Sequence, residues 1–287
     1  MVRRSSPTLR NRELGALLKG YREARDLTAA QVAKDVGLPA ATISRLENAS
    51  RTSPRSGPPH VRALCSYYGL DAHTTERLVQ MAKEGSQPGW WQRYNLESPL
   101  ATYVDLESAA VAIDNFEATL IPGLLQTSEY AREVISPVRL HFSADQLDRT
   151  VESRIQRQRI LTGENPLLFH AVIDEAALHR TVGNNSIMRE QLSNIRRLAT
   201  ELPNVTVQIL PFSVGANPGN DGGFSVLNFA EKMLPPVIYA EGQLGQIFED
   251  DPDEVNRVKE IFAGLAGLAL DGDQSLGMID KLVRTLT

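Results

Sequence analysis

Apolar residues near the amino end recur at intervals of three and four positions, which is the spacing of amphipathic helices. In the first such segment the apolar positions are Leu14, Leu17, Leu18 and Tyr21. The pattern predicts helices over residues 9–25, 29–36, 39–48 and 60–68. Thr28 is placed to cap the second helix, Gly37 ends it, and Pro39 is tolerated in the first turn of the third.

The second and third predicted helices are separated by a short turn around Gly37. Two such helices form a helix-turn-helix unit, whose second helix can enter the major groove of DNA. If Ile43 and Leu46 face inward, the outward face of the third helix carries Ala40, Ala41, Ser44, Arg45 and Asn48. Arginine can make a bidentate contact to guanine, and small residues can touch a thymine methyl group. A solvent-exposed helix face can have the same composition, so the pattern alone leaves both interpretations open.

The segment AAQVAKDVGLPAATISRLENA, residues 29–49, resembles the helix-turn-helix of the Cro and lambda/434-type repressors, the XRE family. The matching positions are Val32, Ala33, Gly37, Ile43 and Glu47. The resemblance implies a five-helix DNA-binding domain that contacts bases with the start and outward face of the third helix. It also implies phosphate contacts around the second helix, which Thr28 precedes, and an ion pair between Glu47 and Arg22. A carboxylate on the core side of a helix needs such a partner when it is removed from water.

Two features depart from that family. Ala29 stands where the family often has glutamine, which puts one phosphate contact in doubt. The loop over residues 49–59 is also longer than in compact repressors, and its Arg51 and Arg55 are candidates for contacts to the DNA backbone or the minor groove. A solvated loop without contacts is the alternative.

The second half of the chain alternates strand and helix patterns after a turn-rich break at residues 85–89. Strands are predicted over residues 109–116, 167–173, 205–210, 224–229 and 237–239. Helices are predicted over residues 124–135, 143–161, 174–181, 186–202, 252–270 and 276–286. The expected fold is therefore a mainly α helix-turn-helix domain over residues 1–84, followed by an α+β domain over residues 85–287.

This half resembles the region that follows the helix-turn-helix in a group of actinobacterial regulators often described as antitoxin-like. The resembling residues include Gly89-Trp90-Trp91, the string Pro122-Gly123-Leu124-Leu125-Gln126-Thr127, Tyr130-Ala131, Arg154 with Arg157-Gln158, Glu175-Ala176 with Leu178, Met188 with Gln191-Leu192, Pro211-Phe212 and Gly223-Phe224. The resemblance implies a cytoplasmic regulator of differentiation or secondary metabolism, frequently encoded beside a small partner protein. It carries over no ligand and no catalytic residue.

Several polar and aromatic residues of this half are candidates for a partner or ligand site. Trp90 and Trp91 either anchor a domain edge or form an exposed interface. Gln126 and Thr127 either cap a helix or bind an anion at its start. Arg154, Arg157 and Gln158 share one helix face, which is either solvated or fits an acidic partner. The glycine-rich segment 213–223 is expected to be a plain hairpin loop, with a lid over a pocket as the alternative.

The two halves of the chain carry net charges of opposite sign. The chain has 287 residues with 30 basic and 35 acidic side chains, a net charge of −5. Residues 1–84 carry +6 and the remainder carries −11, and a basic module favours a polyanionic partner. Cys65 is the single cysteine, so no internal disulfide is expected. No apolar run is long enough for a membrane span and no apolar run follows the first arginines, so a soluble cytoplasmic protein is expected.

Catalytic and metal-binding patterns are not found in the sequence. The five histidines show no metal-ligand spacing, and Glu175 with His179 is interpreted as a surface pair on one helix. There is no Gly-x-Ser-x-Gly motif, and the acidic run at residues 249–254 lacks the spacing of a calcium loop. We therefore expect no enzyme, no cofactor and no metal.

The sequence predicts a dimeric, sequence-specific transcriptional regulator that binds double-stranded operator DNA. The C-terminal half is expected to supply dimerisation and to receive a signal from a small molecule or a protein. One alternative is an antitoxin-like protein whose main role is binding a small protein encoded nearby. A third hypothesis, an enzyme with a DNA-binding appendage, would require a bound metal or a convergent polar cleft.

Overall fold

The fold is given by a computed structural model that describes residues 6–48, 57–87, 89–94, 96, 98–138, 142–230 and 234–286. Internal contacts divide the chain into two units. The N-terminal unit comprises residues 3–109 with 230–234, and the C-terminal unit comprises residues 110–229 with 235–287. The fold class predicted from the sequence, helical followed by α+β, is confirmed.

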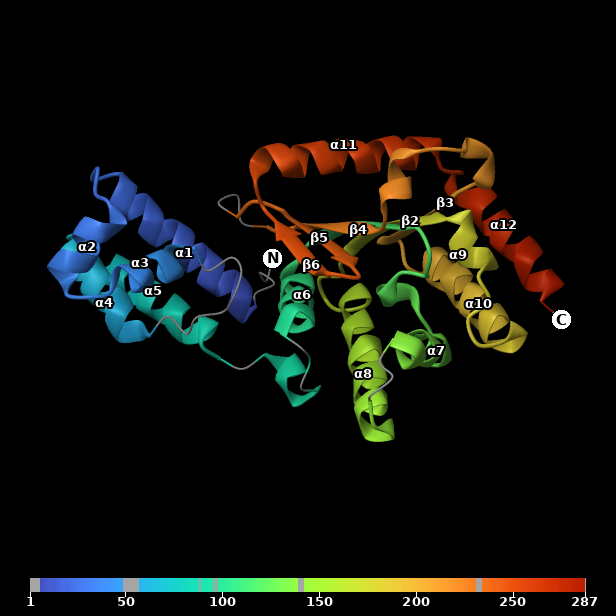
Figure 1. The fold of residues 1–287 in the computed structure, drawn as a ribbon, viewed down its shortest axis with the longest axis horizontal. Coiled ribbons are helices and arrows are strands. Elements are labelled where there is room, and N and C mark those ends of the chain that lie inside the picture. The colour runs from blue at the N-terminus through green and yellow to red at the C-terminus, as the bar shows by residue number, and fades with distance from the viewer. Residues whose placement is uncertain are drawn as a thin grey trace. The chain divides into compact units, whose positions relative to one another are not determined.

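The N-terminal unit is helical. Its elements are α1 (Pro7–Glu23), α2 (Ala29–Val36), α3 (Ala40–Glu47), α4 (Pro58–Tyr67), α5 (Ala72–Gly85), the 3-10 turn η1 (Trp90–Tyr94) and α6 (Ser98–Ala109). The α-helices are labelled in Figure 1. The helices predicted over residues 9–25, 29–36, 39–48 and 60–68 are confirmed, and α5 is the fifth helix that the repressor resemblance implies. Their apolar faces form one core, which includes Leu14, Leu18, Val32, Ile43, Leu46, Val61, Leu64, Cys65 and Leu78.

Helix α6 was not predicted. Residue 109 was expected to begin a strand, but it is the last residue of α6, and β1 begins at Ala112. Apolar and acidic residues of α6 are buried together, among them Val104, Asp105, Leu106 and Glu107. A helix that is buried on several sides lacks the contrast of polar and apolar faces from which a helix is predicted. The domain boundary at residues 84/85 stays a prediction.

The N-terminus of α1 contacts α6 through a buried carboxylate. Asp105 has no exposed surface, and its Oδ2 accepts the backbone N–H of Thr8 in the first turn of α1. The Oγ of Ser6, the N-cap residue, accepts the N–H of Leu9 at 3.2 Å. Burial raises the pKa of Asp105 to about 6, while hydrogen bonds from Thr8 and Ser6 oppose that shift.

The raised pKa of Asp105 makes the stability of the folded chain depend on pH. Its pKa is higher in the folded than in the unfolded chain, so the folded state holds the proton more tightly. The stability that the proton contributes is present below about pH 4 and is lost as the pH rises through about 6, a change of roughly 3 kcal/mol. Asp105→Asn should remove this part of the pH dependence, as measured by urea unfolding between pH 4.5 and 7.5. Parallel pH profiles for the wild type and Asp105→Asn would contradict the assignment.

The C-terminal unit is built on one mixed sheet. Its strands are β1 (Ala112–Glu117), β2 (Leu168–Asp174), β3 (Val205–Leu210), β4 (Phe224–Asn228), β5 (Val237–Gly242) and β6 (Gly245–Glu249). Within the described residues their order is β3-β2-β1-β4-β5-β6. Strands β1, β2 and β3 are parallel, whereas β4, β5 and β6 continue the sheet from β1 in antiparallel fashion.

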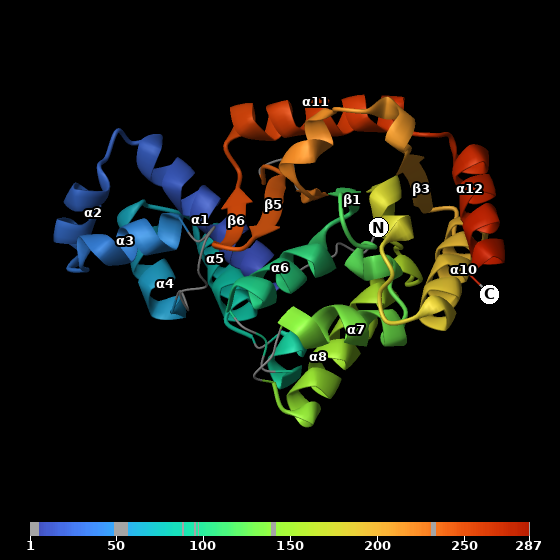
Figure 2. The ribbon, with the colours of Figure 1, turned by 45° about the vertical axis from the view of Figure 1, so that its right-hand side comes forward.

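Helices cover both faces of this sheet. They are η2 (Gly123–Leu125), α7 (Ser128–Val138), α8 (Ala144–Arg157), η3 (Gln158–Leu161), α9 (Glu175–His179), α10 (Asn185–Glu201), η4 (Phe212–Val214), η5 (Pro218–Asp221), α11 (Pro252–Leu268) and α12 (Gly272–Thr285). Helix α11 runs along one face, and α7 and α8 lie on the other (Figures 1 and 2). The core beneath α11 contains Phe116, Val172, Leu210, Phe262 and Leu265. None of the helices within the described ranges is long and apolar enough to cross a membrane.

Two expectations for this unit are corrected, and one strand was missed. The helix predicted from residue 124 begins at Ser128, because Gly123–Leu125 forms a 3-10 turn. Strand β6 was not predicted. The segment 213–223 is not a plain hairpin, because β3 and β4 are separated in the sheet by β2 and β1. The surface pair of Glu175 and His179 is confirmed, with Oε1 and Nε2 3.3 Å apart.

Candidate nucleic-acid interface

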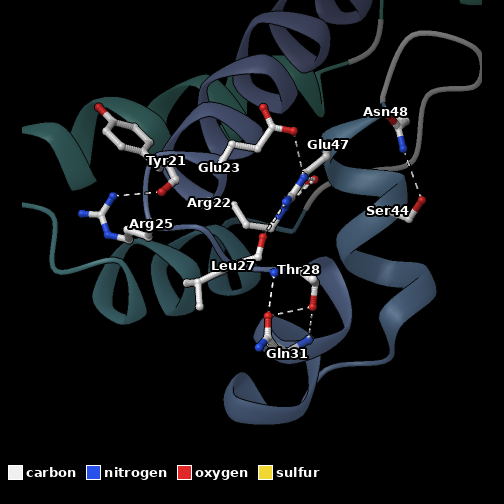
Figure 3. Close-up of polar contacts among 10 residues, drawn as sticks. All are labelled: Tyr21, Arg22, Glu23, Arg25, Leu27, Thr28, Gln31, Ser44, Glu47 and Asn48. Carbon is white, nitrogen blue, oxygen red and sulfur yellow. Dashed lines mark hydrogen bonds and ion pairs between the residues drawn. The ribbon is translucent and has the colours of Figure 1, made fainter.

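The start of α2 is fixed by a reciprocal pair of hydrogen bonds. Thr28 Oγ1 accepts the backbone N–H of Gln31 at 3.2 Å, and Gln31 Oε1 accepts the N–H of Thr28 at 2.8 Å (Figure 3). This arrangement is a capping box, which satisfies two N–H groups that have no partner within the helix. The sequence Thr-x-x-Gln is its signal, and the prediction of a capped helix rested on Thr28 alone.

The turn between α2 and α3 depends on a glycine. Gly37 has a φ of 71°, in the left-handed region that glycine adopts without strain. The N–H of Leu38 then donates to the carbonyl of Ala33 at 2.9 Å, which closes the end of α2. Pro39 precedes the first turn of α3, so α3 begins at Ala40 directly after the turn.

Helix α3 has one buried face and one exposed face. Ile43 is fully buried and Leu46 is 3% exposed. The predicted reading face lies on the other side, where the exposed residues are Ala40, Ala41, Ser44, Arg45 and Asn48. Arg45 lies back along the helix, with Nε donating to the carbonyl of Ala41 at 3.1 Å and Nη2 to Thr42 Oγ1 at 3.3 Å. Asn48 Nδ2 donates to Ser44 Oγ at 3.2 Å (Figure 3).

An ion pair joins α1 to the end of α3. Arg22 Nε donates to Glu47 Oε1 at 2.8 Å, and Nη2 donates to Glu47 Oε2 at 2.9 Å (Figure 3). Nη1 donates to the carbonyl of Leu27 at 2.7 Å, just before α2. The Glu47 side chain is only 4% exposed, and its hydrogen bonds raise the pKa of Arg22. This is the pair that the repressor resemblance implies, and it fixes α3 relative to α1 and the start of α2.

A close backbone approach also positions α3. A Cβ atom added at Gly15 in α1 would lie 2.6 Å from the carbonyl oxygen of Leu46 and 2.8 Å from that of Glu47. Both distances are shorter than van der Waals contact, so only glycine allows the two helices to lie this close. This role of Gly15 cannot be predicted from the sequence, because a glycine inside a helical pattern has no distinctive signal.

Four further candidates precede the C-terminal unit: Arg51 and Arg55 for DNA binding, and Trp90 and Trp91 for a partner or ligand. Arg51 and Arg55 fall outside the described residues. Trp91 is 8% exposed and packs edge-on against Trp90, which is half-buried and packs edge-on against Tyr94. A Cβ added at Gly89 would overlap the Trp91 ring, which explains why a glycine precedes the two tryptophans.

The polar candidates of the C-terminal unit converge on the loop before α7. Gln126 is 3% exposed, and its Nε2 donates to the carbonyl of Ile121 at 2.7 Å. Arg154 Nη1 donates to Gln126 Oε1 at 2.9 Å, and Gln158 Nε2 donates to the carbonyl of Gln126 at 2.6 Å. Thr127 Oγ1 accepts the N–H of Tyr130 at 3.3 Å, which makes it a cap of α7.

Of the two alternatives given for this face of α8, a solvated face is wrong in part. Arg157 is 7% exposed, and its guanidinium would lie 3.6 Å from a Cβ added at Gly123. Arg154, Arg157 and Gln158 face the 123–126 loop and hold it in place. Periodicity placed these residues on one face but could not show that a loop covers it.

Two family models match the chain. One, described as a helix-turn-helix domain, covers residues 13–78, which contain α1 from residue 13 onward, α2 to α4 and the first half of α5. The other, described as a domain of unknown function (DUF5753), covers residues 100–281. No curated protein and no solved structure matches the chain. Because the second match spans more than half of the chain, this protein belongs to the DUF5753 family, and it carries a helix-turn-helix domain ahead of that region.

Proposed function

We propose that the chain is a sequence-specific DNA-binding transcriptional regulator that enters the major groove with α3. The observation that carries the proposal is the exposed face of this helix, which presents small and polar side chains around Arg45 while Ile43 and Leu46 are buried. Small side chains permit close approach to base edges, and arginine pairs with the O6 and N7 acceptors of guanine. The net charge of +6 on residues 1–84 supports attraction to phosphates.

Each exposed residue has a distinct role in this proposal. Arg45 leaves its intrahelical bonds to contact a guanine, Ser44 and Asn48 donate to bases or phosphates, and Ala40 and Ala41 touch thymine methyl groups. The N-terminus of α2, capped by Thr28, lies against the DNA backbone, where a helix N-terminus favours phosphate. Arg51 and Arg55 are proposed to contribute phosphate or minor-groove contacts.

We further propose that the regulator acts as a homodimer. A single helix-turn-helix module contacts few base pairs, whereas a two-fold dimer reads two half-sites about 34 Å, or one helical turn, apart. The C-terminal unit is the candidate for dimerisation and for receiving a signal. The resemblance to antitoxin-like regulators supports a protein signal, and a cluster of polar side chains at the carboxyl end of β1 supports a small-molecule one.

Arg45→Ala is expected to relax sequence preference. The variant should lose about 1–3 kcal/mol of binding free energy on the preferred duplex and almost none on a scrambled duplex, because the lost contact is to a base. The measurement is selection of bound duplexes from a random pool, followed by titration of the preferred one.

Arg62→Ala is the matched control, since it removes an exposed arginine on α4 whose Nη2 pairs with Glu76 at 3.0 Å. It should leave the selected sequence unchanged. If Arg45→Ala selects the same sequence with the same affinity as the wild type, α3 does not read the bases as proposed.

A further inference from the structure

A cluster of polar side chains lies at the carboxyl end of β1 in the C-terminal unit. Phe116 packs beneath α11, so its neighbours Asn115 and Glu117 face the opposite side of the sheet. The strand register places Ser225 of β4 beside Asn115. Here the sheet changes from parallel pairing, β1 with β2, to antiparallel pairing, β1 with β4. In open sheets, ligands bind outside the carboxyl ends of parallel strands where the strand order changes direction.

Asn115 leaves one hydrogen-bond acceptor without a partner. The residue is 6% exposed, and its Nδ2 donates to Ser225 Oγ at 3.0 Å and to the carbonyl of Phe224 at 3.3 Å. Its Oδ1 is buried and has no hydrogen-bond partner among the described residues. A buried acceptor without a donor costs free energy, so such an atom in a folded protein calls for a specific explanation.

Two carboxylates, Glu117 and Glu241, lie on the same face of the sheet as this acceptor. Burial raises the pKa of Glu117 to about 7, Asn115 and Arg154 lower it, and the charge of Glu241 on β5 raises it. Arg154 also donates to Gln126 Oε1, so its guanidinium is shared with the loop before α7. Glu241 is exposed, and its Oε2 lies 3.1 Å from the hydroxyl of Tyr239. With both carboxylates ionised, Glu117, Glu241 and Arg154 carry a net charge of −1.

Gly223 lies directly against Glu117. A Cβ atom added at Gly223 would lie 3.0 Å from Glu117 Oε2 and 3.1 Å from the carbonyl oxygen of Phe116. Any other residue would therefore crowd the carboxylate. The cluster thus combines a buried acceptor, two carboxylates and one cation whose donors are shared with another loop.

We propose that this cluster binds a small organic cation with N–H donors, a primary ammonium or a guanidinium, between Glu117 and Glu241 and against Asn115 Oδ1. The ligand neutralises the net charge of −1 and also donates a hydrogen bond to Asn115 Oδ1. Hydrogen bonds between charged groups are stronger than those between neutral groups. If the cation is the signal that the C-terminal unit receives, this site rests on the proposed regulatory function. The binding itself does not, since it can be measured without DNA.

The test is calorimetric titration and thermal melting of the full chain with n-butylammonium and n-butylguanidinium. Tetramethylammonium, which has the same charge but no N–H donor, is the control cation at equal ionic strength. At ten times its Kd, a bound cation is expected to raise the Tm by about 3 °C. Affinity should fall about tenfold from pH 8 to pH 6, because Glu117 with a pKa of about 7 must be ionised.

Variants locate the site. Glu117→Gln should weaken binding about tenfold or more, and the exposed Glu241→Gln, which leaves the core untouched, should weaken it severalfold. Glu260→Gln makes the same charge change at an exposed position on α11 and should bind as the wild type does. The proposal is overturned if neither N–H cation binds, if tetramethylammonium binds equally well, or if Glu241→Gln and Glu117→Gln keep full affinity. None of these outcomes depends on whether the chain binds DNA, so the two proposals fail separately.

Discussion

Arg22→Ala is expected to lower the free energy of unfolding of the N-terminal unit by about 3–5 kcal/mol. The substitution removes the partner of a carboxylate whose side chain is 4% exposed, so Glu47 would remain charged and buried without a counter-ion. It also removes the hydrogen bond to the carbonyl of Leu27 before α2. The measurement is the urea or thermal unfolding transition followed by circular dichroism.

Arg25→Ala is the control for this substitution. Arg25 lies two residues after α1 and is exposed, although it donates to the carbonyls of Tyr21 and Tyr68 and lies over the Tyr68 ring. Its loss should cost about 1 kcal/mol, because no buried charge is left behind. Replacing both members of the pair, as in Arg22→Met with Glu47→Leu, should recover much of the stability that Arg22→Ala loses. Equal costs for Arg22→Ala and Arg25→Ala would remove the structural role assigned to the ion pair.

Gly15→Ala is expected to lower the free energy of unfolding by about 1–3 kcal/mol, because a new methyl group would collide with two backbone carbonyls. Those carbonyls belong to Leu46 and Glu47 at the end of α3, 2.6 and 2.8 Å from the added atom. Backbone atoms cannot rotate away as a flexible side chain can. The collision must therefore shift α3 relative to α1, and DNA affinity should fall together with stability.

Gly20→Ala is a matched control in the same helix. A Cβ atom at Gly20 would meet nothing within 4 Å, and the position is exposed. Alanine there should raise stability by about 0.5–1 kcal/mol, because it loses less conformational freedom on folding than glycine does. Thermal melting of the two variants should thus give shifts of opposite sign. A Gly15→Ala chain that melts at or above the wild-type temperature would show that the close approach is not required.

Local signals explain why the helix-turn-helix could be predicted from the sequence. The bounds of α2 follow from a capping residue at Thr28 and a glycine with positive φ at Gly37, both of which act within one helical turn. The exposed face of α3 followed from the periodicity of Ile43 and Leu46. Gly15 could not be identified in the same way, because its role depends on a helix about thirty residues further along the chain.

Non-local contacts explain what the sequence analysis missed in the C-terminal unit. The sequence of segment 213–223 predicts a hairpin loop, but the sheet order shows two strands between β3 and β4. Strand β6 is short and lies at the sheet edge, and the two residues that join it to β5, Gln243 and Leu244, are not a pair that signals a hairpin. The cluster around Glu117 joins β1, β4, β5 and α8, and no spacing along the chain brings those residues together.

The most direct measurement of the central claim is a competition between two duplexes for the full chain at about 150 mM salt. One duplex carries the sequence that the chain itself selects from a random pool, and the other has the same composition in scrambled order. A regulator that reads bases with α3 should bind the selected duplex about a thousandfold more tightly or better. Equal affinity for the two duplexes, or no binding to either at low salt, would contradict the assignment of α3 as a reading helix.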